Sequence, residues 1–215
     1  MPTLMTYAGP VDDMALGTRT GGIPLVPAAF DWPCCTTCAG PMMFIAQLPV
    51  DAPTAQGPAS AADTPPHILS VFMCQNDPGL CAEWDPFAGG NRALVLPSSG
   101  LTAAVVPTEG ETLSPETCGI DRTAMDGASY DAARRRWAEA HGRSEQEVLG
   151  QLGGVPSWLQ ADETPACRSC GHSMGFVAQL EEGHDHRTAL NFGGGGRGYA
   201  FACTACEEGC FLWQC

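Results

Sequence analysis

The chain contains no lysine, and its ten strong cations are all arginines, set against 24 aspartates and glutamates. The formal net charge of the 215 residues is −14 at pH 7. Because Lys and Arg that neutralise phosphates supply most of the affinity of proteins for nucleic acids, this charge argues against a nucleic-acid binder. The same excess of acids favours a basic protein as the partner.

Long apolar runs are also missing. No stretch approaches the roughly 20 apolar residues that a transmembrane helix needs, so we expect no contact with a membrane interior. The first residues, Met1–Leu4, lack the basic and apolar segments of a secretion signal, and we therefore expect a cytoplasmic protein.

Cysteine, in contrast, is abundant, with 12 residues in the chain. In a reducing compartment, cysteines in this number favour metal ligands over disulfides, which remain the alternative.

The chain also carries an internal repeat. Residues 21–48 align with 153–180 without a gap, at a constant offset of 132. An ungapped match of this length indicates a duplication, and identical residues fall at eleven positions of the first copy: Gly21, Gly22, Pro24, Pro33, Cys35, Cys38, Met42, Phe44, Ala46, Gln47 and Leu48.

Short strands dominate the expected elements. Alternation of apolar residues predicts strands at 42–48, 67–74, 93–96, 102–107, 174–180, 188–192, 199–203 and 211–214. Helices are expected at 131–141 and 144–152, where Ser144 and Glu147 form a capping box. Residues 51–66, rich in Pro, Ala and Thr, are expected to be a loop.

These patterns predict an α+β, β-rich fold of two pseudo-symmetric, duplicated halves. The division that we expect is residues 1–108 for the first half, 109–150 for a helical connector, and 151–215 for the second half.

Each half supplies two cysteine pairs, and four thiolates form the tetrahedral cage that zinc prefers. In the second half, two Cys-x-x-Cys pairs predict a zinc-ribbon-like site from Cys167, Cys170, Cys203 and Cys206. In the first half, a tight and a wider pair predict a second zinc site from Cys35, Cys38, Cys74 and Cys81.

The tighter spacing favours the second-half site as the firmer one, and Gly171 suits its turn because a Cβ would crowd the chain there. Cys34 competes for a ligand position in the first site. Iron fits a four-sulfur cage as well as zinc does, so both metals stay open.

Four thiolates leave no coordination position for water, so the zinc is expected to be structural, and an enzyme is less favoured than a binding protein. If the protein is an enzyme, its candidate residues are His184, Asp185 and His186 beside the glycine run 193–196. A zinc-ribbon nucleic-acid binder is a further alternative that the charge disfavours.

Several segments resemble the YwqG-like family of bacterial proteins, a domain family without an established activity. They are Gln151–Gly154 with Pro156 and Trp158, 167–180, 191–196, 74–85 and 211–214. The duplicated Gly-Gly-x-Pro, Cys-x-x-Cys and Phe-x-Ala-Gln pattern is also similar to programmed cell death protein 2. That resemblance implies a chaperone that holds a basic ribosomal protein. We therefore expect a partner-specific chaperone or an inhibitor of the immunity-protein type.

Overall fold

The computed structural model describes residues 1–50, 67–183 and 185–215. The loop expected at 51–66 and the candidate residue His184 lie outside the described part of the chain.

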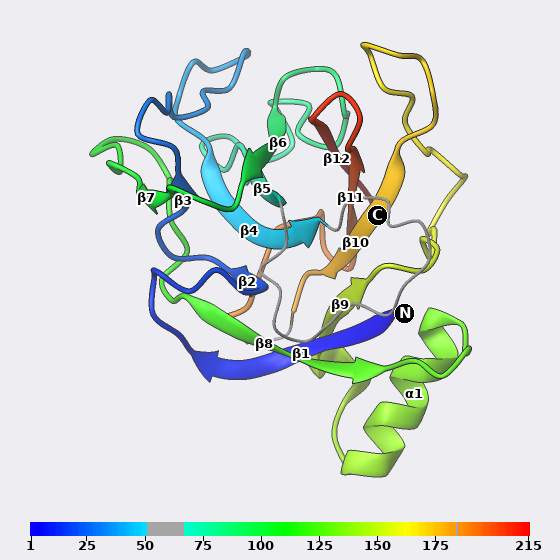
Figure 1. Ribbon diagram of the computed structural model, residues 1–215. Helices are drawn as coiled ribbons and strands as arrows, with labels where there is room; N and C mark the ends of the chain where they lie inside the picture. Colours follow the sequence, from blue (N-terminus) through cyan, green and yellow to red (C-terminus); the bar gives the residue numbers. More distant parts are fainter. Residues whose placement is uncertain (51–66, 184) are drawn as a thin grey trace.

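Ten strands form one closed barrel (Figure 1). Strand β9 pairs with β1 and closes the ring. A separate two-stranded sheet joins β3 (Leu25–Val26) to β7 (Thr102–Ala103). The order around the barrel is β1 (Thr3–Pro10), β8 (Cys118–Ala124), β2 (Arg19–Thr20), β4 (Met43–Val50), β5 (His67–Met73), β6 (Asn91–Pro97), β12 (Glu208–Gln214), β11 (Arg197–Cys203), β10 (Gly175–Glu181) and β9 (Val148–Leu152).

Alternate residues of the strands fill the barrel with aliphatic and aromatic side chains, as the period of two requires. Strand β4 contributes Ala46 and Leu48, and its neighbour β5 contributes Leu69, Val71 and Met73, all fully buried. The buried apolar surface of this interior stabilises the fold.

The single α-helix of the described residues, α1 (Tyr130–His141), packs against the outside of the barrel near β1 (Figure 1). Its buried residues Tyr130 and Trp137 cluster with Leu4 and Val148. It ends at Gly142, whose φ of 61° supplies the left-handed C-cap. The helix expected at 131–141 is therefore confirmed. No helix among the described residues is long and apolar enough to cross a membrane.

The second expected helix, 144–152, is wrong. The capping box of Ser144 and Glu147 is formed, but it opens only a 3₁₀ turn, Glu145–Glu147. Residues 148–152 then become β9, all five of them buried. A strand forms here because β1 and β10 pair with it from either side, and this tertiary pairing overrides the local helical signal.

Most of the expected strands are confirmed, with ends shifted by one to three residues, but two are not. Residues 188–192 are irregular, and the expected strand 102–107 is reduced to the two residues of β7. Strands β1, β2, β3 and β8 are not among those that the sequence predicts.

The fold is β-rich, as expected, and the two aligned segments form matching parts of the barrel. Thr20 of β2 pairs with Ala46 of β4, and 132 residues later Leu152 of β9 pairs with Ala178 of β10. Both β4 and β10 carry a register shift just before this alanine. The same backbone pairing thus occurs in both segments.

The barrel takes strands from all three expected segments. Residues 109–150 hold β8 and the start of β9 as well as α1, so this segment is not purely helical. The division at 108/109 and 150/151 stays a prediction.

Candidate metal centres

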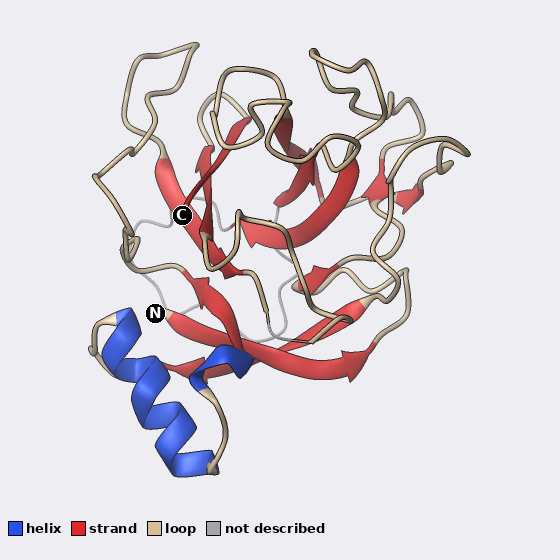
Figure 2. Ribbon diagram, turned by 180° about the vertical axis from the view of Figure 1, so that it is seen from behind, coloured by secondary structure: helices blue, strands red, loops and turns tan. Residues whose placement is uncertain are grey.

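The loops that carry the paired cysteines gather at one end of the barrel, remote from α1, in both views (Figures 1 and 2). One Cys-x-x-Cys loop precedes β4 and the other precedes β10. Cys74 and Cys81 lie in the β5–β6 connection, Cys203 is the last residue of β11, and Cys206 lies in the β11–β12 connection. Strands that are neighbours in the barrel therefore bring each half's four cysteines to one place.

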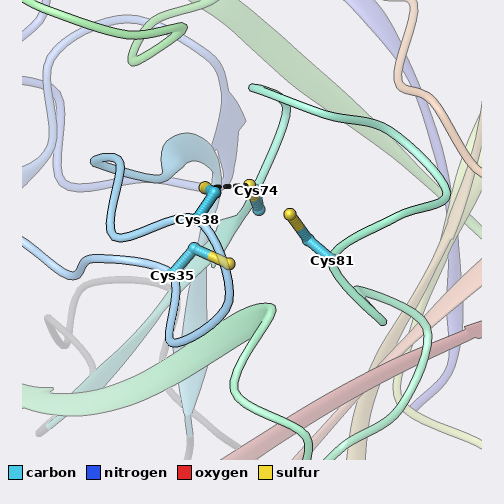
Figure 3. A group of neighbouring side chains, drawn as sticks. All are labelled: Cys35, Cys38, Cys74 and Cys81. Atoms are coloured by element: carbon cyan, nitrogen blue, oxygen red, sulfur yellow. Dashed lines mark hydrogen bonds between the residues drawn. The ribbon is translucent and has the colours of Figure 1, made fainter.

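The structure brings together all eight cysteines named from the sequence, in two groups. In the first centre, Cys35, Cys38, Cys74 and Cys81 place their sulfur atoms within 4.8 Å of one another (Figure 3). In the second centre, Cys167, Cys170, Cys203 and Cys206 do the same.

The sulfur spacing fits a tetrahedral metal. A tetrahedron with metal–sulfur bonds of about 2.3 Å has sulfur–sulfur edges of about 3.8 Å. The Sγ atoms of Cys38 and Cys74 lie 3.6 Å apart, and those of Cys170 and Cys203 lie 3.8 Å apart. All twelve cysteines are free thiols, so no disulfide competes with these groups.

The two Cys-x-x-Cys loops share one hydrogen-bond pattern. The backbone N–H of Cys35 donates to the carbonyl of Gly40, and the N–H of Ala39 donates to the carbonyl of Cys35. At an offset of 132, Cys167 and Gly171 donate in the same way to His172 and Cys167. These tight turns present both sulfur atoms of a pair on one side of the loop.

The residue after the last cysteine of each pair adopts a left-handed conformation. In the Cys-x-x-Cys loops, these residues are Ala39, with φ of 59°, and Gly171, with φ of 74°. In the second pairs they are Ala82, with φ of 50°, and Glu207, with φ of 54°. Non-glycine residues rarely adopt this conformation, and it recurs after the wide pair Cys74/Cys81, so the wide pair ends on the same kind of residue conformation as the tight pairs.

The left-handed backbone conformation is the reason for a glycine at position 171. An added Cβ would meet no atom within 4 Å, so the expected crowding at this position is wrong.

The first centre is buried in an aromatic cluster. Cys35, Cys74 and Cys81 are at most 2% exposed and pack with Phe44 and Phe72. In the second centre Cys167 is buried, Cys203 and Cys206 are half-buried, and Cys170 is exposed. The first centre is therefore the better protected from solvent, while the firmer metal binding that the spacing predicts for the second centre stays a prediction.

The sulfur atoms of the first centre have a hydrogen-bond donor as neighbour, whereas those of the second centre have a carboxylate acceptor. The amide of Asn76 donates to the sulfur of Cys74 at 3.5 Å and of Cys38 at 3.7 Å. In the second centre the carboxylate of Glu208 accepts from the thiol of Cys167 at 3.2 Å and from the backbone N–H of Arg168 at 3.0 Å. Donors stabilise thiolates, whereas an adjacent carboxylate opposes them. Neither Asn76 nor Glu208 has a signal in the sequence.

The pKa values of the cysteine thiols are shifted by their surroundings in both centres. A hydrogen bond from the backbone N–H of His172, followed by one from its side chain, lowers the pKa of Cys170 to about 6. Hydrogen bonds with Cys170 and Cys167 raise the pKa of Cys206 to about 12. In the first centre, burial raises the pKa of Cys81 well above its ordinary value. Metal binding must therefore displace protons from the remaining thiols.

Four cysteines stand outside both centres. Cys34 is exposed, with its sulfur 3.7 Å from the carbonyl of Trp32, and it does not join the first centre. Cys118 and Cys210 are buried, and Cys215 is exposed.

The candidate catalytic residues form no catalytic arrangement within the described chain. Both carboxylate oxygens of Asp185 lie 2.7 Å from the guanidinium of Arg187, which holds the pKa of Asp185 well below its usual range. The side chain of His186 is 86% exposed. The glycine run closes instead on the carboxylate of Glu182, which accepts the backbone N–H groups of Phe192, Gly194 and Gly195.

A family model described as a domain of unknown function, DUF1963, matches residues 18–205. The chain belongs to this family. The match confirms the resemblance to an uncharacterised bacterial family. It includes seven of the eight cysteines of the two centres and ends one residue before the eighth, Cys206.

One curated relative of this DUF1963 chain is the uncharacterised protein YpfL of Salmonella typhimurium, which is 33% identical over 69 residues. The matched region is 31% of this chain and 15% of that protein, so the chain spans a small part of its relative. Neither match concerns programmed cell death protein 2, and that resemblance stays a hypothesis.

Proposed function

We propose that this protein binds a basic protein partner, as a partner-specific chaperone or an immunity-type inhibitor, and that two structural zinc ions hold its binding surface. The observation that carries the proposal is the pair of closed four-sulfur groups. Each offers four thiols within 4.8 Å and leaves no ligand position for a substrate or water.

The sites are proposed to be zinc-ribbon-like, one in each half of a duplicated α+β fold. Support comes from the hydrogen bonds and strand pairs that recur at an offset of 132. Zinc would hold two loops together in each half, and the first centre would take Cys35, Cys38, Cys74 and Cys81 without Cys34.

A cavity of about 470 Å³ is lined by residues of β1, β4, β9 and β10, and a second, of about 340 Å³, includes Glu181 and Glu182 in its lining. The larger of these two suits binding. Its lining within the described residues includes Arg122, Phe176 and Cys203 but no His, Asp or Glu. A general acid or base is therefore missing from this lining.

The binding surface that we propose is the loop of residues 77–88, which we call the aromatic loop. It exposes Leu80 to 77%, Trp84 to 44% and Phe87 to 47%, and three large exposed apolar residues in one short loop are typical of an interaction surface. The loop carries no arginine, and of its three acids Asp77 is exposed and Asp85 half-buried while Glu83 is buried, so its accessible charge is negative and suits a basic segment.

Contacts along its length fix this loop. Cys81 belongs to the first centre, and Asp85 accepts the backbone N–H groups of Phe87 and Ala88 at 2.7 and 2.9 Å. Trp84 packs edge-on against Trp213 of β12, with ring centroids 6.1 Å apart. Such a preordered loop would bind with little loss of conformational entropy.

A pull-down from lysate of the native cells tests this proposal. We expect a basic protein to be retained at low salt and lost at high salt, because screening weakens exposed charge pairs. Trp84→Ala should reduce retention, whereas Val105→Ala, which changes a 93% exposed apolar residue outside the loop, should not. Retention of no protein at low salt, or equal retention by both variants, would contradict the proposal.

A further inference from the structure

The two candidate centres differ most at one sulfur atom. Cys170 is exposed, and its Sγ lies 3.8 Å from that of Cys203, which is half-buried. In the first centre the Sγ atoms of Cys38 and Cys74 lie 3.6 Å apart, but Cys74 is fully buried and Cys38 is half-buried. A small oxidant from solution can therefore reach the second centre before the first.

The neighbouring side chains enlarge this difference. Asn76 donates to two sulfur atoms of the first centre, which disperses their negative charge. Glu208 instead places a carboxylate oxygen 3.2 Å from the sulfur of Cys167. A metal bound by four thiolates carries net negative charge, so this carboxylate opposes the thiolate of Cys167 and weakens the second centre.

We propose that Cys170 is an oxidation site for hydroperoxides, and that its oxidation forms a disulfide with Cys203 and releases the metal of the second centre alone. The proposal rests on the metal content proposed above and adds a reagent class and a reacting residue to it.

The chemistry balances with the peroxide as the oxidant. The thiolate of Cys170 attacks one oxygen of hydrogen peroxide, the O–O bond breaks, and a proton converts the leaving hydroxide to water. The thiolate of Cys203 then attacks the sulfur of the Cys170 sulfenic acid, the S–O bond breaks, and a second proton converts the leaving hydroxide to water. The result is one disulfide and two water molecules, and the metal departs because only two thiolates remain.

Loss of this metal would loosen a defined part of the second half. The loops 167–170 and 203–206 cover a cluster that includes Trp158, Tyr199 and Phe201. The first centre and its aromatic cluster lie in the other half and would stay intact.

The test is peroxide titration of the full-length, metal-loaded protein, with released zinc followed by a chromogenic chelator. We expect release of one of two zinc equivalents, and peptide mapping should find the Cys170–Cys203 disulfide. The second equivalent should appear only after a mercurial or denaturant is added. Glu208→Gln, which keeps the acceptor oxygen for Arg168 and removes the charge, should slow the first release. Cys34→Ser, which removes an exposed thiol outside both centres, should leave it unchanged.

Several results would overturn this proposal. They are release of both equivalents together, release of neither, a disulfide that omits Cys170, or loss of release in Cys34→Ser. A protein that contains two zinc ions but resists peroxide refutes the oxidation site and leaves the proposed function standing. A folded protein without metal refutes both.

Discussion

Ala39 and Gly171 occupy the same left-handed backbone position in the two Cys-x-x-Cys loops, with φ angles of 59° and 74°. Each donates its N–H to the carbonyl of the first cysteine of its pair, at 2.9 and 2.8 Å. One loop thus contains a strained alanine where the other contains a glycine.

This difference predicts opposite effects of exchanging the two residues. Ala39→Gly should raise the free energy of unfolding by up to about 1 kcal/mol, since relief of strain exceeds the added entropy of glycine in the unfolded chain. Gly171→Ala should lower it by about 1–2 kcal/mol, because only backbone strain is added at this open position. Chemical denaturation with metal present measures both, and a stabilising Gly171→Ala would show that the shared turn is misread.

Burial predicts the order of stability losses among the cysteines. Cys74→Ser should be more destabilising than Cys170→Ser, since Cys74 is fully buried and bonded by Asn76 while Cys170 is exposed. Structural zinc supplies on the order of 10 kcal/mol in small domains, so loss of a buried ligand should unfold at least the first half. Cys34→Ser, next in sequence to a ligand but outside the centre, should stay within about 0.5 kcal/mol of the parent. Thermal unfolding compares the three variants, and an equal loss in Cys34→Ser would place Cys34 among the ligands.

The amide of Asn76 gives a prediction for metal affinity. Asn76→Asp keeps the oxygen that accepts the backbone N–H of Glu111 at 3.1 Å but replaces the donor to the sulfur atoms with an acceptor. We expect about a 10–100-fold loss of metal affinity at the first centre, the usual effect of losing such a neighbour. Competition with a chelator of known affinity measures this loss, and an unchanged affinity would show that the amide does not support the thiolates.

A buried tyrosine predicts how stability changes in alkali. Burial raises the pKa of Tyr199 from 10.0 to about 12. Its hydroxyl donates to the carbonyl of Ser157 at 3.0 Å and accepts from the N–H of Leu159 at 3.2 Å. Because the folded pKa is the higher one, the contribution of Tyr199 is complete below pH 10.0 and is lost as the pH rises through about 12.

Denaturant unfolding at a series of alkaline pH values checks this. Tyr199→Phe should be less stable than the parent near neutral pH and should lose less stability as the pH rises. An identical pH slope in the two proteins would contradict the assignment.

The sequence predicts these centres better than it predicts the barrel. Cysteine spacing and the ungapped repeat name all eight cysteines, because a metal cage requires thiols in close pairs. The repeat also places Gln47 and Gln179 at equivalent buried positions. There Gln47 donates to the carbonyls of Ala15 and Gly17, and Gln179 accepts the N–H of Ser157.

What local patterns miss depends on distant partners. Strand β9 carries a helix-start signal, but pairing with β1 and β10 makes it a strand. Gly150 within it has φ of 138°, and a Cβ there would come within 1.9 Å of the carbonyl oxygen of Gln179. The roles of Asn76 and Glu208 likewise arise only when loops from separate strands meet.

Metal analysis of the freshly purified full-length chain tests the central claim most directly. Elemental analysis should give two zinc ions per chain, and prolonged chelation should remove them with loss of cooperative unfolding. A folded protein that contains neither zinc nor iron, and that unfolds identically with and without chelator, would contradict the account.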